Sequence, residues 1–258
     1  MTDIQVIQRV TDILNVFTAD APAVRLGPLA RELDMQRSTL HRYLNSMANA
    51  GLLVRGVDNT FRLGPVAARL GTLALNVGLE PETLTAAMNA LCIATRLTVV
   101  RSVWNELAPV VIQTVIPDTP THVSVKVGTR LPLTAAQMVI FLAFDQGIDK
   151  RDQLLSLLSD QERSQLEQSI EFAESHGITI GGRVSSGVRA IATPILGPEG
   201  NAVMSLALIG TTVTVPDSPF SKEARLLVET AATLSQLMGY SGAHPAQEFV
   251  SDEGLRAI

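Results

Sequence analysis

Cysteine and aromatic residues are scarce in this sequence. Cys92 is the one cysteine among 258 residues, and aromatic residues make up 4% of the chain. A single cysteine excludes a disulfide framework within the chain and agrees with a reducing cytoplasm, where we expect the protein to reside. With so few aromatic side chains, the hydrophobic cores must consist mainly of leucine, isoleucine, valine and alanine.

Long uncharged hydrophobic runs are also missing. Every stretch long enough to span a membrane contains charged residues. The N-terminal residues MTDIQVIQRV do not form the pattern of a signal peptide. We therefore expect no membrane segment. The hydrophobic content of 46% and the chain length are sufficient for two small domains, each with its own core.

Acidic residues are absent from one stretch, Met35 to Val57, which contains three arginines. The net charge of −5 conceals a difference between the two parts of the chain. Residues 1–77 hold eight arginines and six acidic residues, a net of +2, whereas residues 78–258 hold twelve basic and nineteen acidic residues, a net of −7. The positive charge is thus confined to the N-terminal part, and the acidic remainder disfavours nonspecific binding to nucleic acid.

Helical periodicity predicts two short helices around this acid-free stretch. Apolar residues at helical spacing between Leu26 and Leu33 indicate the first helix, with Gly27-Pro28 expected at its start. Asp34-Met35 forms a tight break. The second helix is predicted from about Gln36 to Ala50, followed by Gly51 as its C-terminal stop. Two short helices in this order are typical of a helix-turn-helix.

The second of these helices has an outer side without a carboxylate. Leu40, Leu44 and Met47 fall on its inner side and are expected to be buried. Arginine, asparagine and hydroxyl side chains on the outer side are suited to guanine, adenine and phosphate groups respectively, whereas an ordinary solvated helix would normally include glutamate and aspartate. The predicted DNA contacts are Arg37, Ser38, Thr39, His41, Arg42, Asn45, Arg55 and Arg62.

Two strand-like runs, 52–55 and 60–63, follow the second helix and predict a β-hairpin wing with its arginines near phosphate groups. At this point the sequence resembles the IclR family of bacterial transcription regulators. The resemblance rests on Ser-Thr-Leu-His-Arg-Tyr-Leu at 38–44, Gly-Leu-Leu at 51–53 and Phe-Arg-Leu-Gly at 61–64. It implies a winged helix-turn-helix domain at residues 1–64. We expect it to bind a pseudo-palindromic operator in double-stranded DNA, as a dimer or a dimer of dimers.

The remaining chain is predicted to form a linker helix, a second domain and a tail. The helix at 65–79 is apolar nearly all round, which favours burial against a partner. The domain at 80–240 alternates strands and helices, which indicates an α+β class, and the tail at 241–258 is expected to be loose. Helices are predicted at 4–17, 81–94, 134–144, 161–176 and 218–240, and strands at 97–104, 109–116, 122–127, 188–196 and 202–209.

Two further phrases, Gly128–Leu133 and Gly187–Ile195, are similar to the GAF-like effector domain of the IclR family. That resemblance implies an effector pocket, but several polar positions of the family are apolar here. The family's cysteine corresponds to Ala190, and two serines that often bind effector carboxylates correspond to Ala207 and Ile209. The candidate effector residues are Leu133, Thr134, Gln137, Met138, Ser185, Ser186, Ala190, Ala207 and Ile209.

This exchange of polar for apolar residues leaves three alternatives for the pocket. In the first alternative the pocket binds an apolar or aromatic effector, because a carboxylate in a cavity without hydrogen-bonding groups would be desolvated at a cost of several kcal/mol. Alternatively, its own side chains fill it, namely Met138, Ile191 and Ile209. A small carboxylate is the third alternative, with new contacts from Arg183, Arg189, Thr134 or Gln137.

Two other classes of function are weighed against DNA binding. The four histidines, His41, His122, His176 and His244, are far apart in sequence and belong to no catalytic or metal motif, and Cys92 lies in an apolar helical pattern. We therefore expect no catalytic residue, no metal site and no cofactor. A winged helix that contacts only proteins, with the second domain as a dimerisation scaffold, is the other alternative. Salt-dependent binding to palindromic DNA distinguishes it from a DNA-binding module.

Overall fold

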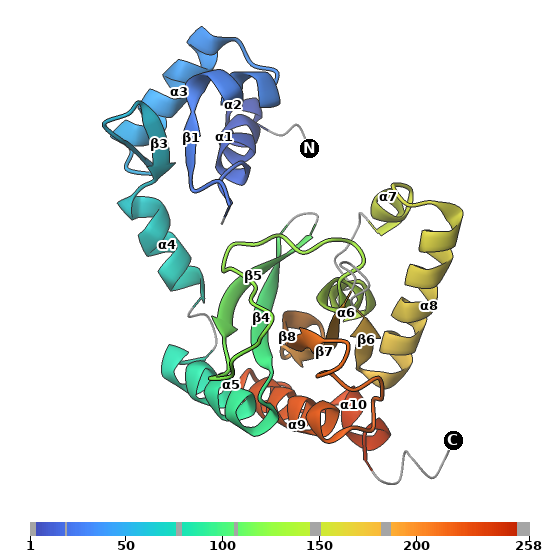
Figure 1. Ribbon diagram of the computed structural model, residues 1–258. Coiled ribbons are helices and arrows are strands. Elements are labelled where there is room, and N and C mark those ends of the chain that lie inside the picture. Colours follow the sequence, from blue (N-terminus) through green and yellow to red (C-terminus); the bar gives the residue numbers. More distant parts are fainter. Residues whose placement is uncertain are drawn as a thin grey trace. The chain divides into compact units, whose positions relative to one another are not determined.

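The computed structural model describes residues 4–18, 20–75, 79–105, 108–144, 151–181 and 187–251. The chain divides into two compact units, Met1–Val77 and Gly78–Ile258, both drawn in Figure 1. The predicted class, an N-terminal helix-turn-helix followed by an α+β region, is confirmed. Within the described residues, no helix combines the length and the apolar character needed to cross a membrane.

The first unit is organised around a small core of leucines. Leu29, Leu40, Leu44 and Leu53 are at most 1% exposed and pack with Ile13 in one cluster. The two predicted helices of the helix-turn-helix and the helix before them are confirmed. The elements are α1 (Gln5–Asn15), β1 (Ala23–Arg25), α2 (Leu26–Glu32), α3 (Arg37–Asn49), β2 (Leu53–Arg55), β3 (Thr60–Leu63) and α4 (Pro65–Leu75).

The wing is a three-stranded antiparallel sheet with the order β1-β3-β2. The predicted hairpin of β2 and β3 is confirmed, and β1, which the sequence did not reveal, pairs with the other side of β3. Gly64 leaves the wing beside the main chain of Gly51, where any Cβ would lie 2.3 Å from the Gly51 carbonyl oxygen. Only glycine fits this close approach.

The second unit contains a five-stranded antiparallel sheet with the order β5-β4-β8-β7-β6. The predicted pairs β4/β5 and β7/β8 are confirmed. The strands are β4 (Thr98–Asn105), β5 (Ala108–Val115), β6 (Thr179–Gly181), β7 (Val188–Leu196) and β8 (Ala202–Thr211). The helices are α5 (Pro81–Thr95), α6 (Ala136–Phe144), α7 (Arg151–Leu155), α8 (Asp160–His176), α9 (Lys222–Leu237) and α10 (Pro245–Phe249).

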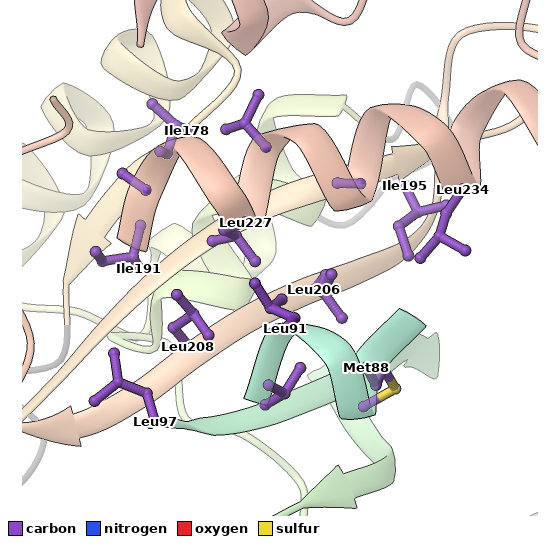
Figure 2. Close-up of a cluster of buried hydrophobic side chains, with 14 of the residues drawn as sticks. Met88, Leu91, Leu97, Ile178, Ile191, Ile195, Leu206, Leu208, Leu227 and Leu234 are labelled. Atoms are coloured by element: carbon purple, nitrogen blue, oxygen red, sulfur yellow. The ribbon is translucent and has the colours of Figure 1, made fainter. Parts of the chain in front are cut away.

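Helices cover both faces of this sheet, which creates two separate cores (Figure 1). On one face, α5 and α9 pack on the strands through Met88, Leu91, Leu206, Leu208 and Leu227 (Figure 2). On the other face, α6 lies on the strands and α8 packs against α6. Successive residues of a strand point to opposite faces, so Val99 belongs to the first core and Val100 to the second.

Local signals in the sequence fix the ends of the helices on these faces. At the start of α8, the Ser159 hydroxyl accepts a hydrogen bond from the Glu162 amide, and the Glu162 carboxylate accepts one from the Ser159 amide. This reciprocal capping box satisfies two donors that a helix start otherwise leaves unpaired. Gly177, with φ of 66°, ends the same helix in the left-handed conformation.

The strand predicted at 122–127 is wrong. This segment has no ladder of main-chain hydrogen bonds, and instead its carbonyl groups are held by side chains of the neighbouring strands. Thr98 Oγ1 donates to the Val123 carbonyl at 2.6 Å, and Thr114 Oγ1 donates to the Val125 carbonyl at 2.8 Å. Hydroxyl groups at strand positions can replace a main-chain pairing that the sequence pattern alone suggests.

The prediction of a loose tail from residue 241 is also wrong as far as Ser251. The short helix α10 packs beside α8 and α9, with Ala246 and Val250 buried. The Phe249 ring lies 4.1 Å from the His176 ring and 5.1 Å from the Phe220 ring, measured between centroids. These aromatic contacts hold α10 against the rest of the unit. Residues 252–258 of the predicted tail lie outside the described residues.

The apolar surface of α4, the predicted linker helix, is partly open in the single chain. Leu70 is 49% exposed and Leu73 is 56% exposed. The first turn of α1 is open too, with Val6 at 55% and Ile7 at 62%. The predicted burial of α4 against a partner stays a prediction.

Candidate DNA interface and effector site

The helix α3 separates its apolar and polar residues as the sequence predicted. Leu40, Leu44 and Met47 are at most 3% exposed and hold the helix on the core. Asn45 is half-buried on the outward side. The other predicted DNA contacts of this helix are exposed: Arg37, Ser38, Thr39, His41 and Arg42. The outward surface thus presents hydrogen-bond donors and positive charge without a carboxylate.

Neighbouring residues position two of these side chains. A Cβ at Gly27 of α2 would lie 3.3 Å from Arg37 Nη2, so the guanidinium lies directly over α2 where no side chain intervenes. Asn45 Nδ2 lies 3.3 Å from His41 Nδ1, one helical turn away, and the two side chains form a hydrogen bond. A side chain with a defined rotamer loses less conformational entropy on binding than a free one.

The wing carries exposed arginines on β2 and β3. Arg55 ends β2 and donates from Nη2 to Asn59 Oδ1 at 2.6 Å, across the turn. Asn59 adopts a left-handed conformation with φ of 58°, which asparagine tolerates better than most residues. Arg62 is exposed on β3. The structure therefore brings the wing arginines onto the unit that carries α3, each with its guanidinium open to an external anion.

Asp58 is the one carboxylate in the turn of the wing, and Thr60 and Arg25 both interact with it. Thr60 Oγ1 donates to Asp58 Oδ1 at 2.7 Å, and Arg25 Nη2 lies 3.6 Å from Asp58 Oδ2. The hydrogen bond from Thr60 is the largest cause that lowers the pKa of Asp58 below its usual value, and Arg25 contributes to the same direction. The carboxylate is therefore charged at neutral pH, although it is occupied within the turn.

The described candidate effector residues lie on α6 or close to it in the core that it covers, and most are enclosed. Met138 and Ala207 are fully buried, and Ala190 and Ile209 are at most 8% exposed in the same cluster. Leu133 packs at the edge of this cluster and Thr134 is exposed. Ser185 and Ser186 lie outside the described residues.

Gln137 is occupied by the main chain of the sheet. Its Nε2 donates to the Val100 carbonyl at 3.3 Å and to the Ser205 carbonyl at 3.1 Å, and the side chain is 2% exposed. Ser102, which sequence reasoning missed, lies on the same face, and its buried Oγ has no hydrogen-bond partner within the described residues. A serine at an alternating position of a buried strand gives no sign of this in the sequence.

Ile191 does not belong to this site, which corrects one member of the predicted pocket filling. It packs against α9 in the opposite core with Leu208 (Figure 2). Arg189, one of the predicted carboxylate contacts, is committed elsewhere. Its Nη2 lies 3.0 Å from Asp217 Oδ2, and its Nη1 donates to the Val215 carbonyl at 2.9 Å. Arg183 lies outside the described residues.

One candidate effector residue borders a cavity. Ile209 lines a cavity of about 90 Å³ at the end of β8, together with Thr98 and His122. The rest of its wall combines polar residues, Arg96, Thr121, Thr211 and Thr214, with apolar ones, Leu97, Pro117 and Val123. A volume of this size holds only a few water-sized groups and is far smaller than a typical small-molecule site.

Groups that support catalysis are not assembled in the described part of the chain. The His122 ring bonds the Thr119 carbonyl, His176 stacks on Phe172, and His244 is buried against the Pro194 carbonyl. Burial raises the pKa of the Cys92 thiol, which keeps it protonated and unreactive. Within residues 4–251 as far as they are described, no group of three His, Cys, Asp or Glu side chains could hold a metal ion.

Comparisons with known proteins agree with the geometry of the first unit. Residues 6–56 match the model of the IclR helix-turn-helix domain. Comparison with the curated proteins finds no match.

Solved structures resemble the chain over nearly its whole length. An IclR-type transcriptional regulator from Silicibacter sp. TM1040 superposes with a TM-score of 0.82 and 19% identity, covering 92% of this chain and 97% of that one. HmgR from Pseudomonas aeruginosa superposes with a TM-score of 0.69 and 25% sequence identity, covering 92% of this chain and 100% of that one. An IclR homologue from Microbacterium hydrocarbonoxydans was solved in complex with 4-hydroxybenzoate. It superposes with a TM-score of 0.72 and 21% sequence identity, covering 90% of this chain and 98% of that one. Residues 6–56 therefore form a helix-turn-helix domain of the IclR type, and the chain has the fold of the solved IclR-type transcriptional regulators over about nine-tenths of its length.

Proposed function

We propose that the outward side of α3 reads base pairs in the major groove while the wing arginines contact phosphate groups. The observation that carries this proposal is the separation on α3, where buried leucines face the core and exposed Arg37, Arg42 and hydroxyl groups face outward without a carboxylate. Arginine binds guanine through two hydrogen bonds and asparagine binds adenine in the same way, which assigns base reading to Arg42 and Asn45. Arg55 and Arg62 bind the backbone.

The basic excess of one unit is small, and this favours binding by more than one subunit. A net charge of +2 on residues 1–77 gives few phosphate contacts per chain. A dimer or dimer of dimers places two recognition helices in successive major grooves, which makes the operator pseudo-palindromic. The half-exposed leucines of α4 and the open apolar turn of α1 supply surfaces for such an association.

The experiment is a measurement of DNA affinity against salt concentration, on an operator selected from random duplexes. Binding through phosphate contacts gives a logarithm of affinity that falls linearly with the logarithm of the salt concentration. Arg42→Ala is expected to lower specific affinity roughly 5- to 150-fold while sparing random DNA, if Arg42 reads a base. Arg163→Ala, on an exposed helix of the second unit, is the matched control.

Two outcomes contradict this proposal. An equal loss on operator and random DNA would make Arg42 a phosphate contact only. A protein that binds no duplex even in dilute buffer would be a protein-interaction module, as the alternative holds.

The second unit is proposed to bind a small, apolar or aromatic effector beneath α6 and thereby to change operator affinity through α4. The apolar character of Met138, Ala190 and Ala207 supports an apolar ligand, and the similarity to a homologue solved with 4-hydroxybenzoate supports an aromatic one. Because these residues are enclosed, the ligand must displace side chains to enter. A ligand-independent regulator with a filled site is the second candidate, favoured by the full burial of Met138 and Ala207.

Release of operator DNA in a panel of aromatic and aliphatic compounds tests the effector proposal. A hydroxyl at the site weakens an apolar ligand, so Ala207→Ser is expected to reduce the response. Ala231→Ser is the matched control, because Ala231 is an equally buried alanine in the opposite core. Equal responses of the two variants would remove Ala207 from the site, and the absence of any response in the wild type would favour the filled site.

A further inference from the structure

Arg101, in the middle of β4, is a buried cation that has no counter-charge among the described residues. The residue is 5% exposed, and it points to the face covered by α5 and α9, where its Nη1 lies 3.1 Å from Met204 Sδ. None of the ion pairs in the described residues includes Arg101. A thioether sulfur is a weak acceptor, and a buried charge normally has a partner of opposite sign because its desolvation costs several kcal/mol.

The hydrogen-bonding capacity of this guanidinium is unused along the edge formed by Nε and Nη2. Nε is fully enclosed and has no hydrogen-bond partner within the described residues. Within the described residues no hydrogen bond is found for Nη2 either, and the one interaction of the guanidinium there is that of Nη1 with Met204 Sδ. Nε and Nη2 together form the side edge of a guanidinium, on which a carboxylate can accept two parallel hydrogen bonds.

The residues around Arg101 supply polar groups at the same place. In the β4/β5 ladder, Gln113 is the direct partner of Arg101 and therefore lies on the same face of the sheet. Gln113 Nε2 donates to Thr85 Oγ1 of α5 at 3.0 Å. Since that oxygen accepts, the Thr85 hydroxyl hydrogen can donate to an anion that arrives from the surface.

We propose that Arg101 anchors a binding site for a small carboxylate, on the face of the sheet opposite to Gln137 and Met138. The ligand's two oxygens lie in the plane of the guanidinium and accept from Nε and Nη2. Burial lowers the pKa of Arg101 but arginine stays protonated at neutral pH, so the site is positively charged when empty. Because only 5% of the residue is exposed, the ligand must reach the guanidinium carboxylate first.

Nuclear magnetic resonance of the arginine side chains in the full-length protein tests the site directly, with acetate as the probe. The Nε–H signal of Arg101 is assigned by its loss in Arg101→Lys. Titration with sodium acetate is expected to shift this signal to saturation, whereas sodium chloride at the same ionic strength leaves it in place. An Arg101 signal that acetate does not move overturns the proposal.

Thermal unfolding supplies an independent measurement. At acetate concentrations about tenfold above Kd, the wild type is expected to gain roughly 3–6 °C in Tm relative to chloride. Arg130→Met, the same change at an exposed arginine, keeps this gain, and Arg101→Met loses it. Without acetate, Arg101→Met is expected to be at least as stable as the wild type, because the substitution removes an unpaired buried charge.

Two results would overturn the assignment to a small ligand. Equal acetate responses of Arg101→Met and the wild type place the effect elsewhere. A shift of the Arg101 signal that depends on protein concentration, in the absence of acetate, assigns the counter-charge to a carboxylate side chain of a second copy.

Discussion

The helices α3 and α6 use polar residues in opposite ways. On α3 the polar residues are exposed and the apolar residues hold the helix in place. On α6, every residue from Ala136 to Leu142 is buried, including Gln137, whose amide is bound to the sheet. A polar residue on an exposed helix is available for binding, whereas a polar residue inside a core first serves the stability of that core. The following substitutions test this difference, beginning with the largest expected effect.

Leu40→Ala tests whether buried leucines alone hold α3 in position. Leu40 is fully buried, and truncation of such a leucine costs about 2–5 kcal/mol because it leaves a cavity. Hydrogen exchange of the α3 amides in the full chain measures the loss of stability, and operator affinity should fall with it. Leu63→Ala, at a half-exposed leucine of the wing, is the control and should change exchange much less.

Gln137→Met tests the structural role of the polar residue on α6. The substitution keeps the volume but removes the donor from two buried carbonyl groups, at a cost of about 1–3 kcal/mol. Urea unfolding of the second unit measures the loss, and Gln113→Met, at a half-buried amide, serves for comparison. Undiminished stability together with a changed effector response would assign Gln137 to ligand binding instead.

The sequence allowed much of the first unit to be predicted, including which residues of α3 are buried and which are exposed. The reason is physical: α3 is amphipathic, so its periodicity alone separates buried Leu40 from exposed Arg42. The strand β1 escaped notice because three residues are too few to show a period. No such periodicity exists on α6, where all residues from Ala136 to Leu142 are buried. The role of Gln137 is therefore visible only in its hydrogen bonds.

The second unit was harder to predict because long-range contacts decide its details. Ile191 and Ala192 are neighbours in sequence but belong to different cores. Which residue faces α6 depends on the register of β7 against β8, which no local signal specifies. The packing of α10 against α8 likewise depends on a contact such as that between the rings of Phe172 and Phe249, which lie more than seventy positions apart in the sequence.

His244 is a buried polar residue whose contribution to stability depends on pH. Its Nε2 donates to the Pro194 carbonyl at 3.0 Å, and its Nδ1 accepts from the Ala246 amide, which requires the neutral ring. Burial lowers the pKa of His244 below its usual value, despite the bond to Pro194. The unfolded chain therefore binds a proton more readily, so the stability present above the unfolded pKa is lost as pH falls through the folded pKa.

Melting curves between about pH 7.5 and pH 5 test this sign. The second unit of the wild type should lose stability toward the acidic end, and His244→Gln should flatten that part of the profile. His122→Gln, at an exposed histidine, should leave the slope intact. A wild-type profile without an acidic decline would mean that His244 titrates normally.

Asp58→Asn, at an exposed residue of the wing, should give the smallest change in stability and in DNA affinity. Its ion pair with Arg25 is open to solvent, and such pairs contribute below about 1 kcal/mol. The amide keeps an acceptor for Thr60 and removes a negative charge from the wing, so affinity for random DNA should rise less than about tenfold, most clearly at low salt. Asp160→Asn, in the second unit, should leave affinity unchanged.

The packing of α10 has a practical consequence for anyone who shortens or tags this protein. A chain that stops at Tyr240 loses the buried Ala246 and Val250 and leaves Phe172 and Phe220 without their aromatic neighbour. Expression of such a truncated chain should yield aggregates, because the uncovered surface is apolar. Affinity tags and fluorescent fusions are better attached after Ser251 than at the end of α9.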